Sequence, residues 1–234
     1  MKVLRRAFGC LAVLAALAVV LPAQAQVVLV TTRPGIGGND FLDWGSLGPN
    51  NTPVPNPFVT QTNNGMSVTV ADAFGFTMRR RDQPIGWSGN FSPGEELLWT
   101  LGDGPMTLIF DSFIVAAGAN IQADFYGPFG ARLEAFDGGG NSLGAVTRDG
   151  NSTAGNDGSA IFIGIADANG LATIKKIVFS LDYATLFPGD FAINRVELKT
   201  VGGNQGPEVP EPGALALLAG FGVAGALIAL RRKR

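Results

Sequence analysis

Short runs of β-branched and aromatic residues alternate with glycine-rich breaks through most of this 234-residue chain, from Gln26 to Gly206. Several runs alternate apolar with polar residues, a period of two that is typical of a strand with one buried face. Glycine and proline are too frequent here for long helices, and no apolar repeat of helical spacing is present. The sequence therefore predicts strands over residues 27–32, 66–71, 73–78, 97–101, 106–116, 119–126, 132–136, 143–147, 160–166, 174–183 and 191–199.

Turn sequences separate these runs. Residues 137–141, Asp-Gly-Gly-Gly-Asn, supply the positive φ angles that a tight hairpin needs. Strands that follow one another without intervening helices pair antiparallel. We therefore predict a mainly β fold, an antiparallel β-sandwich or jelly roll, in one domain over residues 26–201. Within it, we expect an extended surface loop over residues 50–57 and a solvated strand end at residues 79–81, which are three arginines.

The first 25 residues have the three parts of a secretory signal peptide. Three basic residues come first, an uninterrupted apolar run follows over residues 11–21, and small residues precede a cleavage site between Ala25 and Gln26. This apolar run is shorter than the ~20 residues that a helix needs to cross a bilayer core. We therefore expect export through the secretion translocon and removal of residues 1–25 by signal peptidase.

The C-terminal segment also has three parts, after a flexible glycine-rich linker over residues 202–208. The first part is an extended motif, because each of its two prolines disfavours helical backbone in the preceding residue. Residues 213–230 carry no charge and make a helix of about 27 Å, which predicts one transmembrane helix. The basic residues that follow are expected to stay cytoplasmic, which places residues 26–212 outside that membrane. The motif is Val209, Pro210, Glu211 and Pro212, and the cytoplasmic basic anchor is Arg231, Arg232, Lys233 and Arg234.

With this order of motif, apolar helix and basic cluster, residues 209–234 resemble the PEP-CTERM sorting signal. The resemblance implies recognition by an exosortase, a membrane transpeptidase-like enzyme of Gram-negative bacteria that cleaves near the motif. It also implies a precursor anchored in the inner membrane and a final location at the cell surface or outside the cell, commonly where exopolysaccharide is made. The alternative is a plain membrane anchor, which needs the helix and the basic cluster but not the motif itself.

Residues 39–49, 158–164 and 190–194 resemble parts of β-rich domains found on other PEP-CTERM proteins. Composition limits what this domain does. Residues 27–206 carry 10 Lys and Arg against 17 Asp and Glu, a net charge of −7 that disfavours nucleic acid as a partner. The chain has no histidine, and its one cysteine, Cys10, lies in the signal segment. Histidine-based catalysis, disulfides and cysteine metal ligands are therefore excluded from the mature chain.

Three functions remain open for the domain. The first is a non-enzymatic surface or extracellular-matrix protein, associated with exopolysaccharide or biofilm. The second is a carbohydrate-binding jelly roll with a defined glycan site. The third, a carboxylate-based glycosidase, is disfavoured because the adjacent Glu95 and Glu96 would point to opposite faces of a strand. We therefore expect no enzymatic activity.

Aromatic side chains are the candidates for stacking on sugar rings. Trp87 lies in a polar, glycine-rich loop and is the best candidate for an exposed glycan contact, with burial beneath that loop as the other interpretation. Trp99 follows two leucines and is expected in the core. The other aromatic candidates are Trp44, Tyr126 and Tyr183.

One polar stretch, residues 149–157, offers hard oxygen atoms. We interpret it as a long flexible hairpin loop. The alternative is a structural calcium site formed by Asp149, Asn151 and Asp157, because carboxylate and amide oxygens are the ligands that calcium prefers. Their spacing matches no established calcium motif, so no cofactor is expected.

Overall fold

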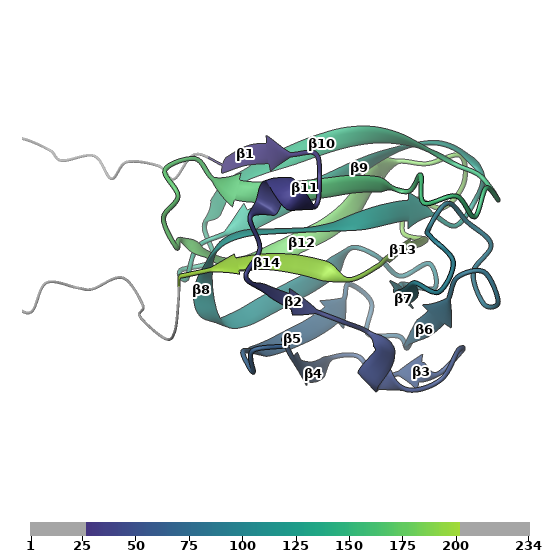
Figure 1. Ribbon diagram of the computed structural model, residues 1–234, viewed down its shortest axis with the longest axis horizontal. Helices are drawn as coiled ribbons and strands as arrows, with labels where there is room; N and C mark the ends of the chain where they lie inside the picture. The colour runs from purple at the N-terminus through teal and green to yellow at the C-terminus, as the bar shows by residue number, and fades with distance from the viewer. Residues whose placement is uncertain (1–26, 202–234) are drawn as a thin grey trace, which may run out of the picture.

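The regular secondary structure of the described chain consists almost entirely of β-strands. The computed structural model describes residues 27–201, and every strand pairing in this range is antiparallel (Figure 1). Its helical elements are two 3₁₀ turns, Pro34–Ile36 and Gly45–Leu47, and no helix among the described residues is long and apolar enough to cross a membrane. The strands are β1 Val27–Val30, β2 Asp40–Leu42, β3 Pro53–Val54, β4 Phe58–Gln61, β5 Ser67–Asp72, β6 Met78–Asp82, β7 Glu96–Trp99, β8 Met106–Ala123, β9 Gly127–Phe136, β10 Ser142–Ser152, β11 Ile161–Asp167, β12 Ile174–Tyr183, β13 Phe191–Ile193 and β14 Val196–Thr200.

The predicted segments at the two ends of the chain lie outside the described residues. These are the signal peptide over residues 1–25, the linker over 202–208 and the sorting signal over 209–234, with its expected transmembrane helix. The cleavage site between Ala25 and Gln26 also lies outside them.

The longest strand, β8, organises the sheet. A straight strand of 18 residues would span about 60 Å. Both ends of β8 nevertheless lie beside the same segment: Gly104, just before the strand, donates a backbone hydrogen bond to Gly189 O at 2.9 Å, and Ala123 pairs with Phe191. The strand therefore turns back on itself, and the register of its pairing with β12 shifts in the middle, between Ile109 and Ile114 (Figure 1).

The two edges of β8 carry different strands. Along one edge lie β5, β14 and β13 in turn, and along the other lie β12 and β11. Each of these strands has further neighbours on its outer side. On the first edge, β5 is followed by β4, β14 by β2, and β13 by β7, β6 and β3. On the second edge, β12 is followed by β9 and β10, and β11 by β1. Fourteen strands thus form one connected sheet, which confirms the predicted mainly β, antiparallel fold. The strand order does not establish a jelly roll, which stays a prediction.

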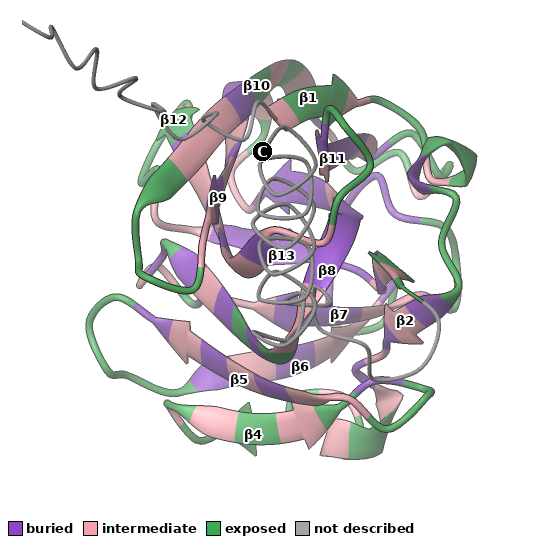
Figure 2. Cartoon of the chain, turned by 90° about the vertical axis from the view of Figure 1, so that its left-hand side faces the viewer, coloured by how far each residue is buried: buried purple, intermediate pink, exposed green. Residues whose placement is uncertain are grey.

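The core fills the space that the bent sheet encloses. Figure 2 shows buried residues along the inner strands, with exposed residues in the outer turns. In β5 the side chains alternate as the sequence predicts, with Val68 and Val70 fully buried and their neighbours half-buried. Burying one such apolar side chain stabilises the fold by roughly 1.5–3 kcal/mol. The largest fully buried side chains are those of Trp44, Phe91, Phe110, Phe129, Phe179 and Phe191.

Two predicted strands are wrong in ways that side-chain hydrogen bonds explain. In the strand predicted over 73–78, residues 73–77 turn and only Met78 belongs to a strand, because Asp72 Oδ1 accepts hydrogen bonds from the backbone N–H groups of Phe74 and Gly75 at 3.2 and 2.9 Å. The strand predicted over 191–199 is split into β13 and β14. At the break, Asn194 Oδ1 accepts the backbone N–H of Asn120 at 2.8 Å, so that a side chain replaces a backbone carbonyl in the ladder.

Three further expectations need correction. The surface loop expected over 50–57 contains β3, whose Val54 is buried. The arginine run 79–81 is not a solvated end, since Arg80 is 4% exposed and forms ion pairs with Asp82 and Glu96. The flexible loop expected over 149–157 begins later, because β10 continues to Ser152.

The described chain ends and the longer loops lie at opposite ends of the domain (Figure 1). Thr200 pairs with Ile114 of β8, whereas Phe191 pairs with Ala123. Nine residues of strand separate these two positions, or about 30 Å. The end opposite the termini, here called the loop end, carries the connections over residues 83–95, 100–105, 124–126 and 184–190.

Candidate functional site

Trp87, the predicted glycan contact, is buried. Its side chain is 4% exposed, and its ring packs edge-on against Phe91 and Trp99 with centroid separations of 6.3 and 5.9 Å. A ring in this position cannot stack on a sugar at the surface. The prediction of an exposed Trp87 is therefore wrong, and the alternative, burial beneath its loop, is what the structure shows.

A polar network explains why the loop over residues 83–95 closes over Trp87. The backbone N–H of Asn90 donates to Gln122 Oε1 at 2.6 Å, and Gln122 Nε2 donates to Ser152 Oγ at 2.6 Å. The Asn90 amide in turn donates to Thr153 Oγ1 at 2.7 Å and Ser159 Oγ at 2.8 Å. Buried polar groups of this kind are satisfied by one another and hold a loop in one conformation.

Trp99, expected in the core, lies between the core and the surface of the loop end. The indole Nε1–H donates to Asp190 Oδ1 at 2.6 Å. The Arg81 guanidinium lies over the same ring, with Cζ 4.6 Å from the ring centroid. This cation–π contact and the charge-assisted hydrogen bond fix three side chains from β6, β7 and the loop before β13 in one place.

Two acidic residues lie near Trp99 and Arg81, Asp190 in contact with Trp99 and Asp124 close enough to feel the charge of Arg81. Burial raises the pKa of Asp190 to about 6, although the hydrogen bond from Trp99 opposes the shift. Burial also raises the pKa of Asp124, which the charge of Arg81 partly offsets. The two residues are joined through the backbone, since Asp124 N donates to Asp190 O at 3.0 Å. Groups whose pKa is shifted by burial and by a charged neighbour are frequent at functional sites.

Two aromatic side chains flank these carboxylates along the chain and remain exposed. Tyr126, next but one after Asp124, is 49% exposed, and its hydroxyl is hydrogen-bonded to the Ser88 carbonyl at 2.9 Å. Phe187, in the turn that ends at Asp190, is 65% exposed and lies 5.4 Å from the ring of Phe125. These residues define the loop-end site, which consists of Arg81, Trp99, Asp124, Tyr126, Phe187 and Asp190.

The remaining aromatic candidates lie elsewhere. Trp44 is fully buried and donates its Nε1–H to Asn194 O at 3.0 Å, which is a structural role. Tyr183 is 46% exposed, and its hydroxyl is 2.9 Å from Asp149 Oδ1 on the neighbouring strand β10. Neither side chain belongs to the loop-end site.

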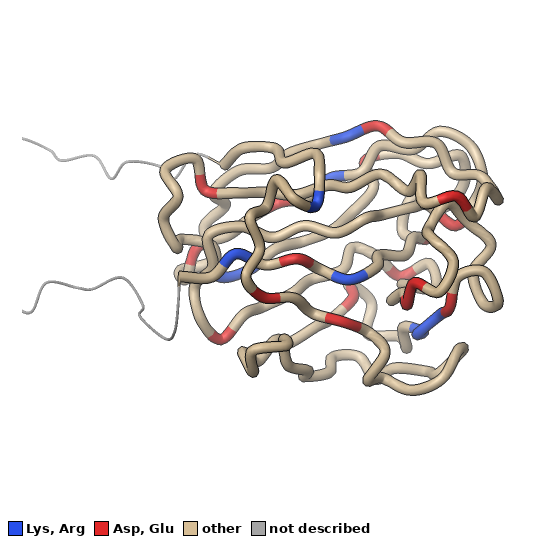
Figure 3. Tube along the Cα trace, viewed as in Figure 1, with Lys and Arg blue, Asp and Glu red and all other residues tan. Residues whose placement is uncertain are grey.

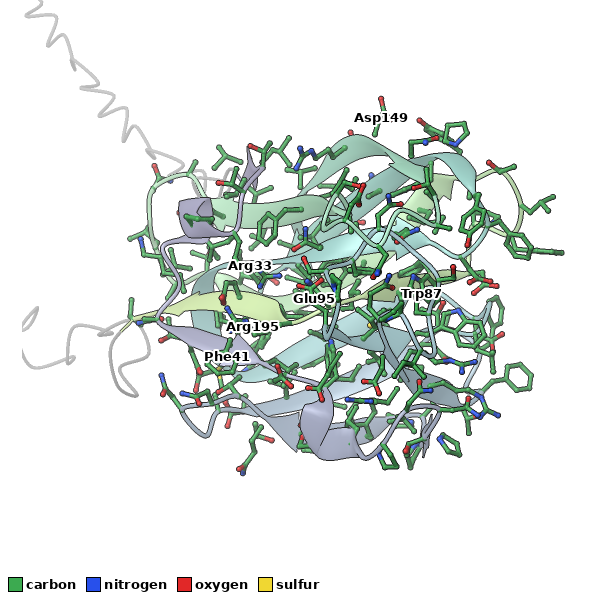
Figure 4. All side chains as sticks on the ribbon, turned by 45° about the vertical axis from the view of Figure 1, so that its right-hand side comes forward. Arg33, Phe41, Trp87, Glu95, Asp149 and Arg195 are labelled. Atoms are coloured by element: carbon green, nitrogen blue, oxygen red, sulfur yellow. The ribbon has the colours of Figure 1, made fainter. Side chains whose placement is uncertain are left out.

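A second polar cluster surrounds Arg33 (Figure 4). Its Nη2 donates to the side-chain oxygens of Asn120 and Asn194, both at 2.9 Å, and its Nη1 donates to Arg195 O at 2.9 Å. Asn194 Nδ2 then donates to Glu95 Oε1 at 2.7 Å. The members satisfy one another, so the cluster clamps the N-terminal segment to β8 and to the break between β13 and β14.

The residues of the calcium alternative do not converge. Asp149 and Asn151 are exposed on β10, and Figure 4 shows Asp149 projecting away from the domain. Asp157 instead accepts hydrogen bonds from the backbone and hydroxyl of Ser159, at 3.0 and 2.6 Å. Within residues 27–201, no group of three Asp, Glu, His or Cys side chains is arranged to hold a metal ion.

Charged residues are interspersed over the part of the domain that Figure 3 shows, rather than gathered into one patch. Glu95 and Glu96, the adjacent acids, have separate partners: Asn194 for Glu95 and Arg80 for Glu96. The predicted sorting motif, Val209 to Pro212, and the basic anchor, Arg231 to Arg234, lie outside the described residues.

The comparisons with known proteins concern the C-terminal segment and the fold. Residues 208–234 match the PEP-CTERM protein-sorting motif. This motif marks a protein that is exported as a membrane-anchored precursor and processed by an exosortase, as the sequence of residues 209–234 predicts. No curated protein matches the chain. The crystal structure of a DUF4465 family protein from Bacteroides caccae is similar at 16% sequence identity and a TM-score of 0.37, covering 74% of this chain and all of that chain.

The sequence predictions include Tyr126 among the aromatic candidates and place Trp99 in the core, but do not single out Asp124, Phe187 or Asp190. Asp124, Phe187 and Asp190 belong to short turn sequences, and turn aspartates are usually explained by local backbone hydrogen bonds. The available signal was an aromatic residue within three positions of an aspartate in two separate turns, 124–126 and 187–190. That pattern does not show that the two turns meet.

Proposed function

We propose that the mature chain is a non-enzymatic component of the cell surface or the extracellular matrix, associated with exopolysaccharide. The observation that carries this proposal is the sorting motif over residues 208–234 on an otherwise β-rich chain. In the precursor, residues 213–230 hold the chain in the inner membrane and the four basic residues stay cytoplasmic. The secretion translocon, signal peptidase and exosortase are then its processing partners.

Several features of the described domain support a binding role rather than catalysis. Glu95 is hydrogen-bonded within the Arg33 cluster, and Glu96 is ion-paired with Arg80. Retaining and inverting glycosidases need two carboxyl groups facing one bond, one of them free to act as an acid. Glu95 and Glu96 are held by partners within the fold and therefore do not form such a pair.

The second candidate function is a carbohydrate-binding module of the jelly-roll type with a defined glycan site. The loop-end site favours it, because exposed aromatic rings lie there beside side chains that donate and accept hydrogen bonds. A glycosidase, which would have to use Asp124 and Asp190 rather than Glu95 and Glu96, and a plain membrane anchor are the further alternatives.

Fractionation of the producing cells tests the surface role. We expect the protein in the extracellular or matrix fraction, with its N-terminus at Gln26 as read by N-terminal sequencing. The inner-membrane fraction should hold only the precursor. Surface material that begins at Met1 would contradict the predicted export route, and mature protein confined to the periplasm would contradict the matrix role.

A further inference from the structure

The loop end presents Tyr126 and Phe187 in fixed positions. The Tyr126 hydroxyl is held by both the carbonyl and the Oγ of Ser88, at 2.9 and 3.0 Å, while half of the side chain stays exposed. A ring that is fixed before binding loses little conformational entropy when a ligand stacks on it. The exposure of Tyr126 is therefore compatible with a binding surface of defined geometry.

Phe187 is held in a conformation that is unfavourable for its residue type. Its φ angle is 42°, in the left-handed region that bulky residues rarely occupy. The turn is fixed from both sides, since Asp190 N donates to Phe187 O at 2.9 Å and Thr100 Oγ1 donates to Gly189 O at 2.7 Å. An exposed aromatic residue kept at such a backbone angle by its surroundings points to a functional constraint on its position.

The polar members of the loop-end site supply both kinds of hydrogen-bonding group. The Arg81 guanidinium offers N–H donors, and the carboxylates of Asp124 and Asp190 offer acceptors. The positive charge of Arg81 is attracted to Asp124, so the site does not present its carboxylates alone. A mixture of donors and acceptors beside aromatic rings suits a ligand that carries many hydroxyl groups. An organic cation would be repelled by the positive charge of Arg81.

From these contacts, we propose that the loop-end site binds a neutral saccharide, with Tyr126 and Phe187 as stacking surfaces and with Asp124 and Arg81 as hydrogen-bonding partners of its hydroxyl groups. The proposal deepens the surface role described above and rests on it. Its place in the fold agrees with that role, because residue 201 lies at the other end of the domain, about 30 Å of strand away.

The test measures saccharide binding by the mature protein purified from the extracellular fraction. The probes are a glycan array and native gels that contain hydroxyethylcellulose, xylan or dextran, with alginate as the anionic comparison and spermidine as the cationic one. We expect binding to at least one neutral glycan. Tyr126→Ala, Phe187→Ala and Asp124→Asn should each weaken that binding roughly tenfold, the effect of losing ~1.4 kcal/mol of contact.

Two control variants separate loss of the site from general damage. Tyr183→Ala removes a tyrosine of matching exposure, 46% against 49%, whose hydroxyl is also hydrogen-bonded. Leu171→Ala removes an exposed apolar side chain outside the loops of the site. Both should bind within about twofold of the wild type, and thermal melting should show that every variant is folded.

The results that overturn the proposal are specific to it. Wild-type protein that binds no neutral glycan, or loop-end variants that bind as well as the controls, would refute the saccharide site. Spermidine binding that these variants abolish would instead identify a site for cations. None of these outcomes affects the surface role, which fails only if the fractionation places the mature protein elsewhere.

Discussion

Asp190 gives the loop end a dependence on pH that a single substitution can isolate. Burial raises its pKa from 3.8 to about 6, so between these values the folded chain binds more protons at this position than the unfolded chain does. The contribution of Asp190 to the free energy of unfolding is therefore fully present below pH ~4 and is lost as the pH rises through about 6.

Asp190→Asn should remove this dependence while keeping an oxygen acceptor for Trp99 Nε1. Each unit of pKa shift corresponds to ~1.4 kcal/mol, and solvent screening of this half-exposed group reduces the whole effect to roughly 1 kcal/mol. We expect the variant to be more stable than the wild type by about that amount at pH 7 and equally stable at pH 4. Denaturant unfolding across this range measures the difference, with the exposed Asp182→Asn as control. If the difference in stability between Asp190→Asn and the wild type did not change with pH, the raised pKa of Asp190 would be contradicted.

Single residues also show how much of the candidate site could be predicted from the sequence. The candidates for sugar stacking were selected by residue type and by local composition. Among them Tyr126 and Tyr183 are exposed, whereas Trp44 and the preferred candidate, Trp87, are buried. Burial of Trp87 depends on hydrogen bonds from Asn90 to residues more than thirty positions away, such as Gln122. Partners this distant in sequence leave no local pattern, so neither the burial nor the meeting of Asp124 with Asp190 was predictable.

At the scale of the strands, the pairing of β8 with β11 depends on two glycines that face each other. A Cβ atom added at Gly118 would lie 2.6 Å from Gly164 Cα and 2.8 Å from Ile163 O. Because these are backbone atoms, the neighbouring strand would have to move. Gly118→Ala should therefore destabilise the domain by roughly 1–3 kcal/mol, the usual cost of overpacking a buried site.

Chemical denaturation of Gly118→Ala and of a second glycine variant measures this effect. Gly139 lies in an exposed hairpin, where an added Cβ would approach only the ends of the Asn141 and Asp137 side chains, at 3.1 and 3.3 Å. Gly139→Ala should change stability by no more than about 0.5 kcal/mol. If the two substitutions had equal effects on stability, the claim that β8 and β11 need a glycine at position 118 to approach each other would be contradicted.

The local pattern of β-branched and apolar residues predicted some strands and turns correctly. The strand predicted over 174–183 is β12 without a change of bounds, and the glycine turn over 137–141 does connect β9 to β10. Predictions failed where side chains replace backbone partners, as at Asp72 and Asn194. The bend of β8 was also missed, because the sequence pattern describes each half of the strand and not the angle between them.

At the scale of the whole molecule, the ends of the described chain and the loops of the proposed binding site lie on opposite ends of the domain. The described chain begins and ends at one end, whereas the loops over 83–95, 124–126 and 184–190 lie at the other (Figure 1). The sorting motif over residues 208–234 follows the last strand after a linker of a few residues. Processing at that motif and binding at the loop end are therefore expected to be independent of each other.

The sorting signal itself is tested by replacing Pro210-Glu211-Pro212 with Ala-Ala-Ala. The helix over residues 213–230 and the basic anchor remain, so the variant should insert into the membrane as the wild type does. If an exosortase reads the extended motif, the variant precursor should not be released.

The most direct measurement of this cleavage and release is mass spectrometry of the C-terminus, in membrane and extracellular fractions of wild type and variant. We expect wild-type chains at their final location to end near the motif, without Leu230 or Arg234, and the variant to accumulate in the membrane with its C-terminal peptide attached. Wild-type protein that keeps Leu230 and Arg234 at its final location would contradict the account, because the segment would then be a permanent anchor.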